Sequence, residues 1–334
     1  MGIDLPLIWA VIIIFGVMMY VVMDGFDLGI GMLYPFFKDE RDRDVMMNTV
    51  APVWDGNETW LVLGGAGLLA AFPLAYSVIL SAFYLPLILM LVGLIFRGVA
   101  FEFRFRAHRS RRIWGVGFHL GSVVAAFAQG LMLGAIVEGM PLEGGKYLHG
   151  AFAWFSPFSV LTGMALVFGY GLLGATWLVL KTEGRPQRIA RDLTRPLMLA
   201  VIAFMVMVSA WLPFLDSRLM DRWFAWPNFL YLSPLPILTV LVAAWLWRAV
   251  LANREVAPFV LALGFFALGF LGLVVGMWPN LVPPTMSIRD AASPPSSQGF
   301  VLVGAAIMIP VVLFYTAYSY RVFRGKVRAG EGYH

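Results

Sequence analysis

The residues Met23-Asp24-Gly25-Phe26-Asp27-Leu28-Gly29 lie in the second half of an apolar stretch that covers about residues 6–34. The motif Trp54-Asp55-Gly56-Asn57-Glu58-Thr59-Trp60 opens the next apolar stretch. A carboxylate in or beside the hydrocarbon of a bilayer costs roughly 3 kcal/mol unless it faces protein or water. The carboxylates of these two motifs therefore predict a buried polar site inside a membrane protein.

The composition places the chain among membrane proteins. Hydrophobic residues make up 60% of its 334 residues, and charged residues make up 13%, whereas a soluble domain is about half apolar and about a quarter charged. The chain has no cysteine, which excludes disulfides and thiolate metal sites. The pI of 9.6 does not indicate nucleic-acid binding, because the charges lie in short loops between apolar stretches.

The apolar stretches predict an all-α, polytopic membrane protein with nine transmembrane helices of about 20 residues each. The predicted spans cover about 6–34, 57–72, 76–100, 113–137, 152–180, 196–212, 227–247, 257–278 and 299–323. Residues 1–334 are interpreted as a single membrane domain. A first helix group in 1–137 and a second in 152–278 are compatible with two four-helix bundles, with 299–323 as a peripheral ninth helix.

The basic residues predict the orientation in the membrane. Most of the 24 lysines and arginines follow the first, third, fifth and seventh spans or belong to the tail. The other side carries only Lys146, Arg218, Arg222 and Arg289. Cytoplasmic loops are enriched in lysine and arginine. The N-terminus is therefore expected outside and the C-terminus in the cytoplasm.

The first acidic motif places two carboxylates on one helix face. Asp24 and Asp27 are three residues apart, and Gly25 and Gly29 form a small-xxx-small pair through which a neighbouring helix could approach. One interpretation is a functional site, and the other is pairing with arginine at the cytoplasmic interface. Arg97, which follows a long apolar run, either extends to that interface or neutralises one of the buried carboxylates.

The second motif also carries two carboxylates three residues apart. Asp55 and Glu58 lie at the start of the predicted second span, where the helix dipole stabilises acidic groups and aspartate is a common N-cap. Trp54, Asn57 and Trp60 surround them with more polar and aromatic groups than a helix cap requires. We therefore favour a proton-relay or ligand site over a simple cap.

The histidines do not supply an obvious heme or metal site. His119 is the one histidine well inside a predicted span, and the others are expected in loops or at the C-terminus. They are His108, His149 and His334. Because heme or metal binding needs converging ligands, we expect no metal ligands in this chain.

Several of these stretches resemble subunit II of the bd-type quinol oxidases, including the cyanide-insensitive oxidases. The resemblance extends over nearly the whole chain, and its most specific part is the segment with Trp54-Asp55-Gly56-Asn57. The segments that carry it are 24–32, 48–60, 96–97, 283–286, 296–298 and 310–317.

The resemblance implies a companion subunit in a quinol:oxygen oxidoreductase of the bacterial cytoplasmic (inner) membrane. Such a complex oxidises quinol and reduces oxygen to water. Its hemes, heme b and heme d (or heme b in place of d), are held by subunit I, the expected partner. Membrane lipids and quinol are further expected contacts, and a small single-helix subunit is left open.

The resemblance also implies roles for residues of the two motifs, although none is catalytic in the strict sense. Family members place the aspartate of the Trp-Asp-Gly-Asn motif, here Asp55, on a proton path from the cytoplasm. By the predicted orientation Glu58, Asp27 and Asp24 also lie near the cytoplasmic face, and we expect them on the same path. In this interpretation Asp55 feeds the path, and Asp27 or Arg97 sets its protonation. Some family members hold a quinone in subunit II near the positions of Trp54, Asp27 and Arg97, so a structural quinone or lipid is expected there.

Two other functions remain open from the sequence. The same carboxylates could couple protons or cations to a solute in a secondary transporter, which would need a helix broken near the midplane and inverted repeats. A purely structural subunit could instead shield the partner's hemes from lipid without carrying protons.

Overall fold

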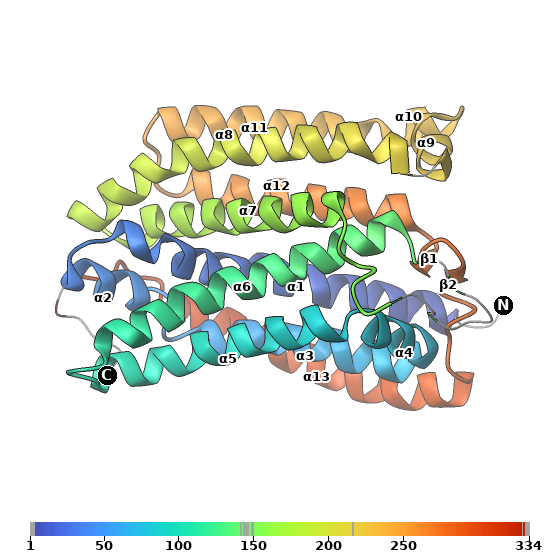
Figure 1. Ribbon diagram of the computed structural model, residues 1–334, viewed down its shortest axis with the longest axis horizontal. Coiled ribbons are helices and arrows are strands. Elements are labelled where there is room, and N and C mark those ends of the chain that lie inside the picture. Colours follow the sequence, from blue (N-terminus) through green and yellow to red (C-terminus); the bar gives the residue numbers. More distant parts are fainter. Residues whose placement is uncertain are drawn as a thin grey trace.

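The computed structural model is an elongated bundle of helices that lie side by side along its longest axis (Figure 1). It describes residues 4–140, 142, 147, 150–215, 217–328 and 330. Its long helices are α1 (Leu5–Leu33), α3 (Trp54–Ala71), α5 (Tyr84–Arg106), α6 (Arg111–Glu138), α7 (Pro157–Lys181), α8 (Gly184–Leu215), α11 (Pro234–Leu251), α12 (Ala257–Met277) and α13 (Pro295–Val322). The shorter elements are η1 (Tyr34–Phe36), α2 (Glu40–Asn48), α4 (Pro73–Ala82), α9 (Ser217–Phe224), α10 (Asn228–Leu232), β1 (Asn280–Val282) and β2 (Met286–Ser287).

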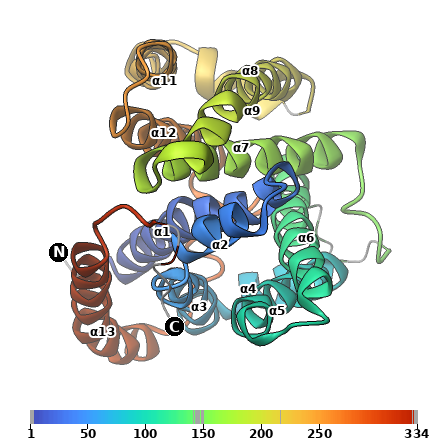
Figure 2. The ribbon, with the colours of Figure 1, turned by 90° about the vertical axis from the view of Figure 1, so that its left-hand side faces the viewer.

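The two ends of the bundle differ. At one end lie α2, the α5–α6, α7–α8 and α11–α12 connections and the C-terminal segment (Figures 1 and 2). We call this the basic end and define it by residues 35–48, 107–110, 182–183, 252–256 and 323–328. The start of α1, α4, α9, α10 and the two strands lie at the opposite end (Figure 1). The charge-rich loops that follow alternate spans in the sequence therefore lie together.

Among the described residues, eight helices are long and apolar enough to cross a membrane. They are α1, α5, α6, α7, α8, α11, α12 and α13, of which α11 is counted together with α10. Helix α3 is not among them, because Asp55, Asn57 and Glu58 make its first two turns polar. The all-α membrane fold is confirmed, and the count of nine crossings stays a prediction.

Close approach of α1 and α7 joins the two predicted helix groups. A methyl group on Gly29 would lie 1.9 Å from the backbone oxygen of Tyr170, and one on Gly174 would lie 2.5 Å from the carbonyl carbon of Gly29. Only glycine fits on either side of this crossing. The larger of two buried clusters draws residues from both groups, including Phe26 and Phe259. The division into two bundles remains a prediction.

Several boundaries differ from those expected, including a break at Ser233 inside the predicted span 227–247 and a start at Pro157 for the span predicted from 152. The predicted span 76–100 is interrupted at Phe83, where α4 ends and α5 begins with Pro86 in its first turn. The basic segment expected as a loop after residue 181 forms the first turns of α8 from Gly184, with Pro196 inside that helix. The segment after the first span contains α2, whose apolar positions are too few for a periodic signal.

Candidate functional site

Three helices bring charges together inside the bundle. Asp24 of α1, Glu58 of α3 and Arg97 of α5 meet in the half of the bundle that is nearer the basic end. Arg97 Nη1 lies 2.7 Å from Asp24 Oδ1, and both side chains are fully enclosed. Arg97 Nη2 also pairs with Glu58, whose side chain is 25% exposed. Arg97 therefore does not extend to the interface, and it neutralises a buried carboxylate.

Asp27, three residues after Asp24 on α1, is held by a hydrogen bond from the amide of Asn57. Asn57 Nδ2 donates to Asp27 Oδ2 at 2.7 Å and, at 3.4 Å, to the backbone oxygen of Met23. Tyr320 of α13 donates to Asn57 Oδ1 at 2.9 Å. The other oxygen of Asp27 has no hydrogen-bond partner among the described residues. One amide thus connects the acidic motif of α1 with α3 and α13.

A further buried chain of polar groups was not predicted. Gln129 of α6 donates to the hydroxyl of Tyr20 at 2.7 Å and accepts from the hydroxyl of Tyr170 at 3.0 Å. Tyr20 lies one helical turn before Asp24 on α1. Gln129 stands in an otherwise apolar segment of α6, and that isolated amide is the sequence signal that could have revealed this chain.

Trp54 shields the cluster on the side of α5. Its ring stacks on Phe101 at a centroid distance of 5.2 Å, and the guanidinium carbon of Arg97 lies 5.8 Å from the centroid of the Trp54 ring. Trp60 is fully buried. Trp54 therefore packs beside the charges, whereas the ring of Trp60 packs against Phe15 of α1.

Asp55 lies apart from the enclosed carboxylates. Its side chain is exposed on the first turn of α3, whereas Asp24 and Asp27 are fully buried. The expectation of one buried site containing all four carboxylates is corrected on this point, because position 55 faces away from α1. The N-cap alternative is also wrong, since Val53 occupies that position and no side chain caps the helix.

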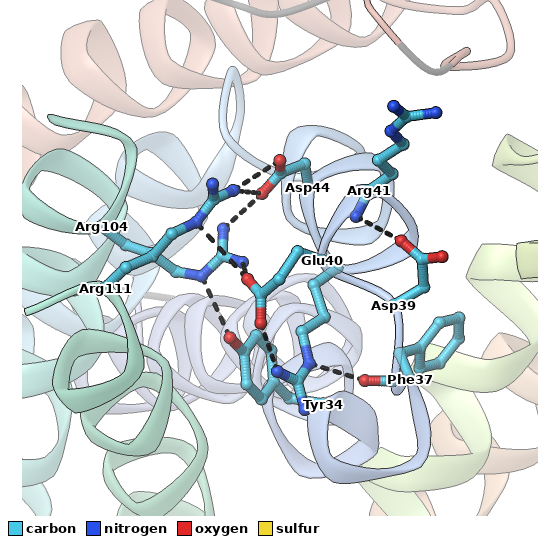
Figure 3. A network of polar contacts seen from close by, with 9 residues as sticks. Tyr34, Phe37, Asp39, Glu40, Arg41, Asp44, Arg104 and Arg111 are labelled. Carbon is cyan, nitrogen blue, oxygen red and sulfur yellow. Dashed lines mark hydrogen bonds and ion pairs between the residues drawn. The ribbon is translucent and has the colours of Figure 1, made fainter. Parts of the chain in front are cut away.

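A second network, at the basic end, fixes α2 against α5 and α6 (Figure 3). The enclosed guanidinium of Arg104 lies 2.7 Å from Glu40 and 2.5 Å from Asp44, and it donates to Tyr34 at 3.0 Å. Arg111 of α6 also pairs with Asp44. This network anchors the segment that leads from α2 into α3, and so it positions the second motif.

No metal site is formed by the described part of the chain, in which no group of three or more His, Asp or Glu side chains converges. His119 Nδ1 lies 2.9 Å from the backbone oxygen of Gly31, a contact that ties α6 to α1. His108 lies exposed in the α5–α6 connection, and His149 and His334 lie outside the described residues. The one span histidine thus has a structural contact.

Comparison with known proteins identifies the family. The family described as cytochrome bd terminal oxidase subunit II matches residues 5–323. The chain belongs to this family. Subunit 2 of the Escherichia coli K12 cytochrome bd-I ubiquinol oxidase is 28% identical over 355 residues, covering 92% of this chain and 91% of the relative. Subunit 2 of the Bacillus subtilis 168 cytochrome bd ubiquinol oxidase is 28% identical, and each chain is covered to 97%.

The fold is also that of a solved bd oxidase. A chain of the bd oxidase from Geobacillus thermodenitrificans matches with a TM-score of 0.81 at 17% identity, covering 96% of this chain and 99% of that chain. As a cytochrome bd subunit II, this multi-pass protein is part of a bacterial respiratory oxidase complex that oxidises quinol with oxygen. Membership in the family implies hemes in that complex and a subunit I as partner.

Proposed function

We propose that this cytochrome bd subunit II holds no heme of its own and supplies a proton path to the heme-bearing subunit I. The observation that carries the proposal is the exposed carboxylate of Asp55 near an ion-pair cluster in which Asp24 and Arg97 are fully enclosed and Glu58 is partly exposed. A carboxylate that is exposed on the surface of a membrane subunit is stabilised where it meets water or a polar neighbour on another subunit. The proposed neighbour is subunit I, whose hemes are heme b and heme d (or b).

The chemistry of the complex requires such a path. Oxygen reduction inside a membrane consumes protons, and the apolar core has no groups that carry them. We place the proton entry at Asp55, with Glu58 one helical turn further along α3. Asp24 and Asp27, whose side chains are fully buried, are the proposed inner carboxylates of the path. Arg97 forms ion pairs with Glu58 and Asp24 and holds both carboxylates in place. Asp55 lies outside these ion pairs and is exposed, so it is the carboxylate best placed to exchange protons.

The proposed location is the bacterial cytoplasmic membrane, with the basic end in the cytoplasm and the N-terminus outside. The clustering of basic residues at one end favours this orientation. Protons would then be taken from the cytoplasm near Asp55. The further partners proposed are membrane lipids and a small single-helix subunit.

The proposed quinone or lipid contact of subunit II involves Trp54, Asp27 and Arg97. Asp27 and Arg97 are fully enclosed within this chain, and Trp54 is half-buried. Trp54 is therefore the residue that a bound quinone ring would contact directly. Arg97 would not touch the quinone and would act on it only through the Trp54 ring, which lies next to its guanidinium group.

Nothing in the arrangement of α3, α4 and α5 favours a transporter. The breaks in this segment, at Phe72 and Phe83, flank α4 at the end opposite the basic end. A transporter of the broken-helix class would place such a break near the midplane. We therefore retain the oxidase subunit as the proposed function.

The companion role is tested by purifying this chain, tagged, in mild detergent from membranes that contain the whole complex. A reduced-minus-oxidised visible spectrum is expected to show heme bands together with a second large subunit. The same chain produced without subunit I is the control and is expected to show no heme bands. Heme bound to the chain alone, or a partnerless heme-free protein from native membranes, would contradict the proposal.

The orientation is tested by single-cysteine labelling, which is unambiguous because the chain contains no cysteine. Arg109→Cys lies exposed at the basic end, and Ser296→Cys lies exposed at the opposite end. A membrane-impermeant maleimide added to spheroplasts is expected to label Ser296→Cys and to label Arg109→Cys only after permeabilisation. The reverse pattern would show that the basic end faces outward.

A further inference from the structure

A basic cavity of about 320 Å³ opens at the basic end, between the end of α7, the start of α8 and the α11–α12 connection. It lies away from the ion-pair cluster of Asp24, Glu58 and Arg97. Its charged lining residues are Arg188, Arg191, Asp192, Arg195 and Arg254. The cavity therefore combines four guanidinium groups with one carboxylate and has an excess of positive charge.

The arginines converge from two sides. Arg188, Arg191 and Arg195 follow one another at spacings of three and four residues, which places them on one face of α8. Arg254 comes from the α11–α12 connection on the other side. Among the described residues, no carboxylate lies within ion-pair distance of Arg188, Arg195 or Arg254. These three guanidinium groups remain available to an anion from outside the chain.

Hydrogen bonds fix the shape of the cavity. Arg191 Nη1 donates to the backbone oxygen of Asn253 at 2.6 Å, and Asn253 adopts a left-handed conformation with φ of 53°. Glu255 is occupied by Lys326 at 2.8 Å, by Gln187 at 3.0 Å and by Arg191 at 3.4 Å. Hydrogen bonds from Lys326 and Gln187 hold the pKa of Glu255 below its usual range. Glu255 is thus already paired within the chain, and it does not neutralise Arg188, Arg195 or Arg254.

The cavity lies at the level where the apolar segments end. Val179 of α7, Val250 of α11 and Pro258 of α12 form an apolar part of its lining. On α8 the charged turns stop at Arg195, and Leu199, one turn further, is already exposed and apolar. An anion in this cavity would therefore sit at head-group depth, with hydrocarbon directly beside it.

We propose that this cavity binds the phosphate group of an anionic phospholipid, with Arg188, Arg195 and Arg254 as the donors. Guanidinium groups form paired, charge-assisted hydrogen bonds with phosphate oxygens. Basic pockets between transmembrane helices at the cytoplasmic side suit anionic head groups. The acyl chains would continue along the exposed apolar face of α8, where Leu199 lies.

The experiment uses the purified oxidase complex, stripped of lipid by detergent and titrated with dioctanoyl phosphatidylglycerol while its thermal unfolding is followed. A ligand that binds only the folded complex raises its Tm. We expect phosphatidylglycerol to raise the Tm of the wild-type complex more than dioctanoyl phosphatidylcholine does. In the variant Arg188→Gln/Arg195→Gln/Arg254→Gln, the apparent affinity for phosphatidylglycerol should fall by about tenfold or more.

The matched control removes three other exposed arginines from the same end of the bundle, which line no part of the cavity: Arg41→Gln/Arg109→Gln/Arg112→Gln. This variant is expected to keep the wild-type response. Equal loss in both triple variants would mean non-specific attraction and would overturn the proposal. An equal response to inorganic phosphate would assign the cavity to a free anion and would overturn the lipid assignment.

Discussion

Replacing Asp55 by asparagine is expected to lower the oxygen-consumption rate of the complex on the order of 100-fold, because proton transfer by a positioned side chain contributes at least that much. Asparagine keeps the size of the side chain and cannot take up a proton. Since Asp55 is exposed on α3 and makes no side-chain contact within the ion-pair cluster, the fold should be unaffected. Oxygen-electrode rates per heme measure the effect, and the heme spectrum should be unchanged.

Two variants control this experiment. Asp55→Glu retains the acid and is expected to keep much of the activity. Glu102→Gln removes an exposed carboxylate of α5 that pairs with Arg106 at 3.4 Å, and it should leave turnover near the wild-type rate. Wild-type turnover in Asp55→Asn would refute a proton path through this residue and would favour the purely structural role.

The second large effect concerns the buried charge cluster. Arg97→Met should lower the free energy of unfolding of the subunit by about 3–5 kcal/mol, because it leaves Asp24 and Glu58 without their cation. Since native proteins are stable by only about 5–15 kcal/mol, little assembled complex should remain. The yield of heme-containing complex and its Tm measure the loss.

The control variants separate the charge effect from the loss of side-chain volume. Arg106→Met lies on the same helix but at an exposed position, and it should change the Tm little. The variant Arg97→Met/Asp24→Asn/Glu58→Gln removes the charges together and should recover part of the lost yield. If Arg97→Met assembled as well as Arg106→Met, the buried ion pairs would not be needed for stability.

The sequence predicted the membrane fold well, because apolar stretches of bilayer length carry their own signal. The spans around His119 and around Gly264 lie inside α6 and α12 as expected. Helix α2 was missed, because its stability depends on ion pairs of Glu40 and Asp44 with Arg104, which comes from a distant part of the chain. A local pattern contains no information about such a partner.

The candidate site was predicted in part. The costs of burying Asp24 and Asp27 pointed correctly to an enclosed polar site, and the structure brings Arg97 and Glu58 to it. The exposure of the Asp55 side chain could not be predicted from the sequence. It depends on the rotation of α3 about its own axis relative to α1. The roles of these residues in proton transfer remain predictions.

The most direct test of the proposed proton path is time-resolved proton uptake during a single turnover. The fully reduced complex, reconstituted in vesicles with the basic end outward, is mixed with oxygen in the presence of a pH-indicator dye outside. Asp55→Asn is expected to slow this uptake by the same factor as steady-state oxygen consumption, while Glu102→Gln leaves it unchanged. Uptake at the wild-type rate in Asp55→Asn would contradict the account.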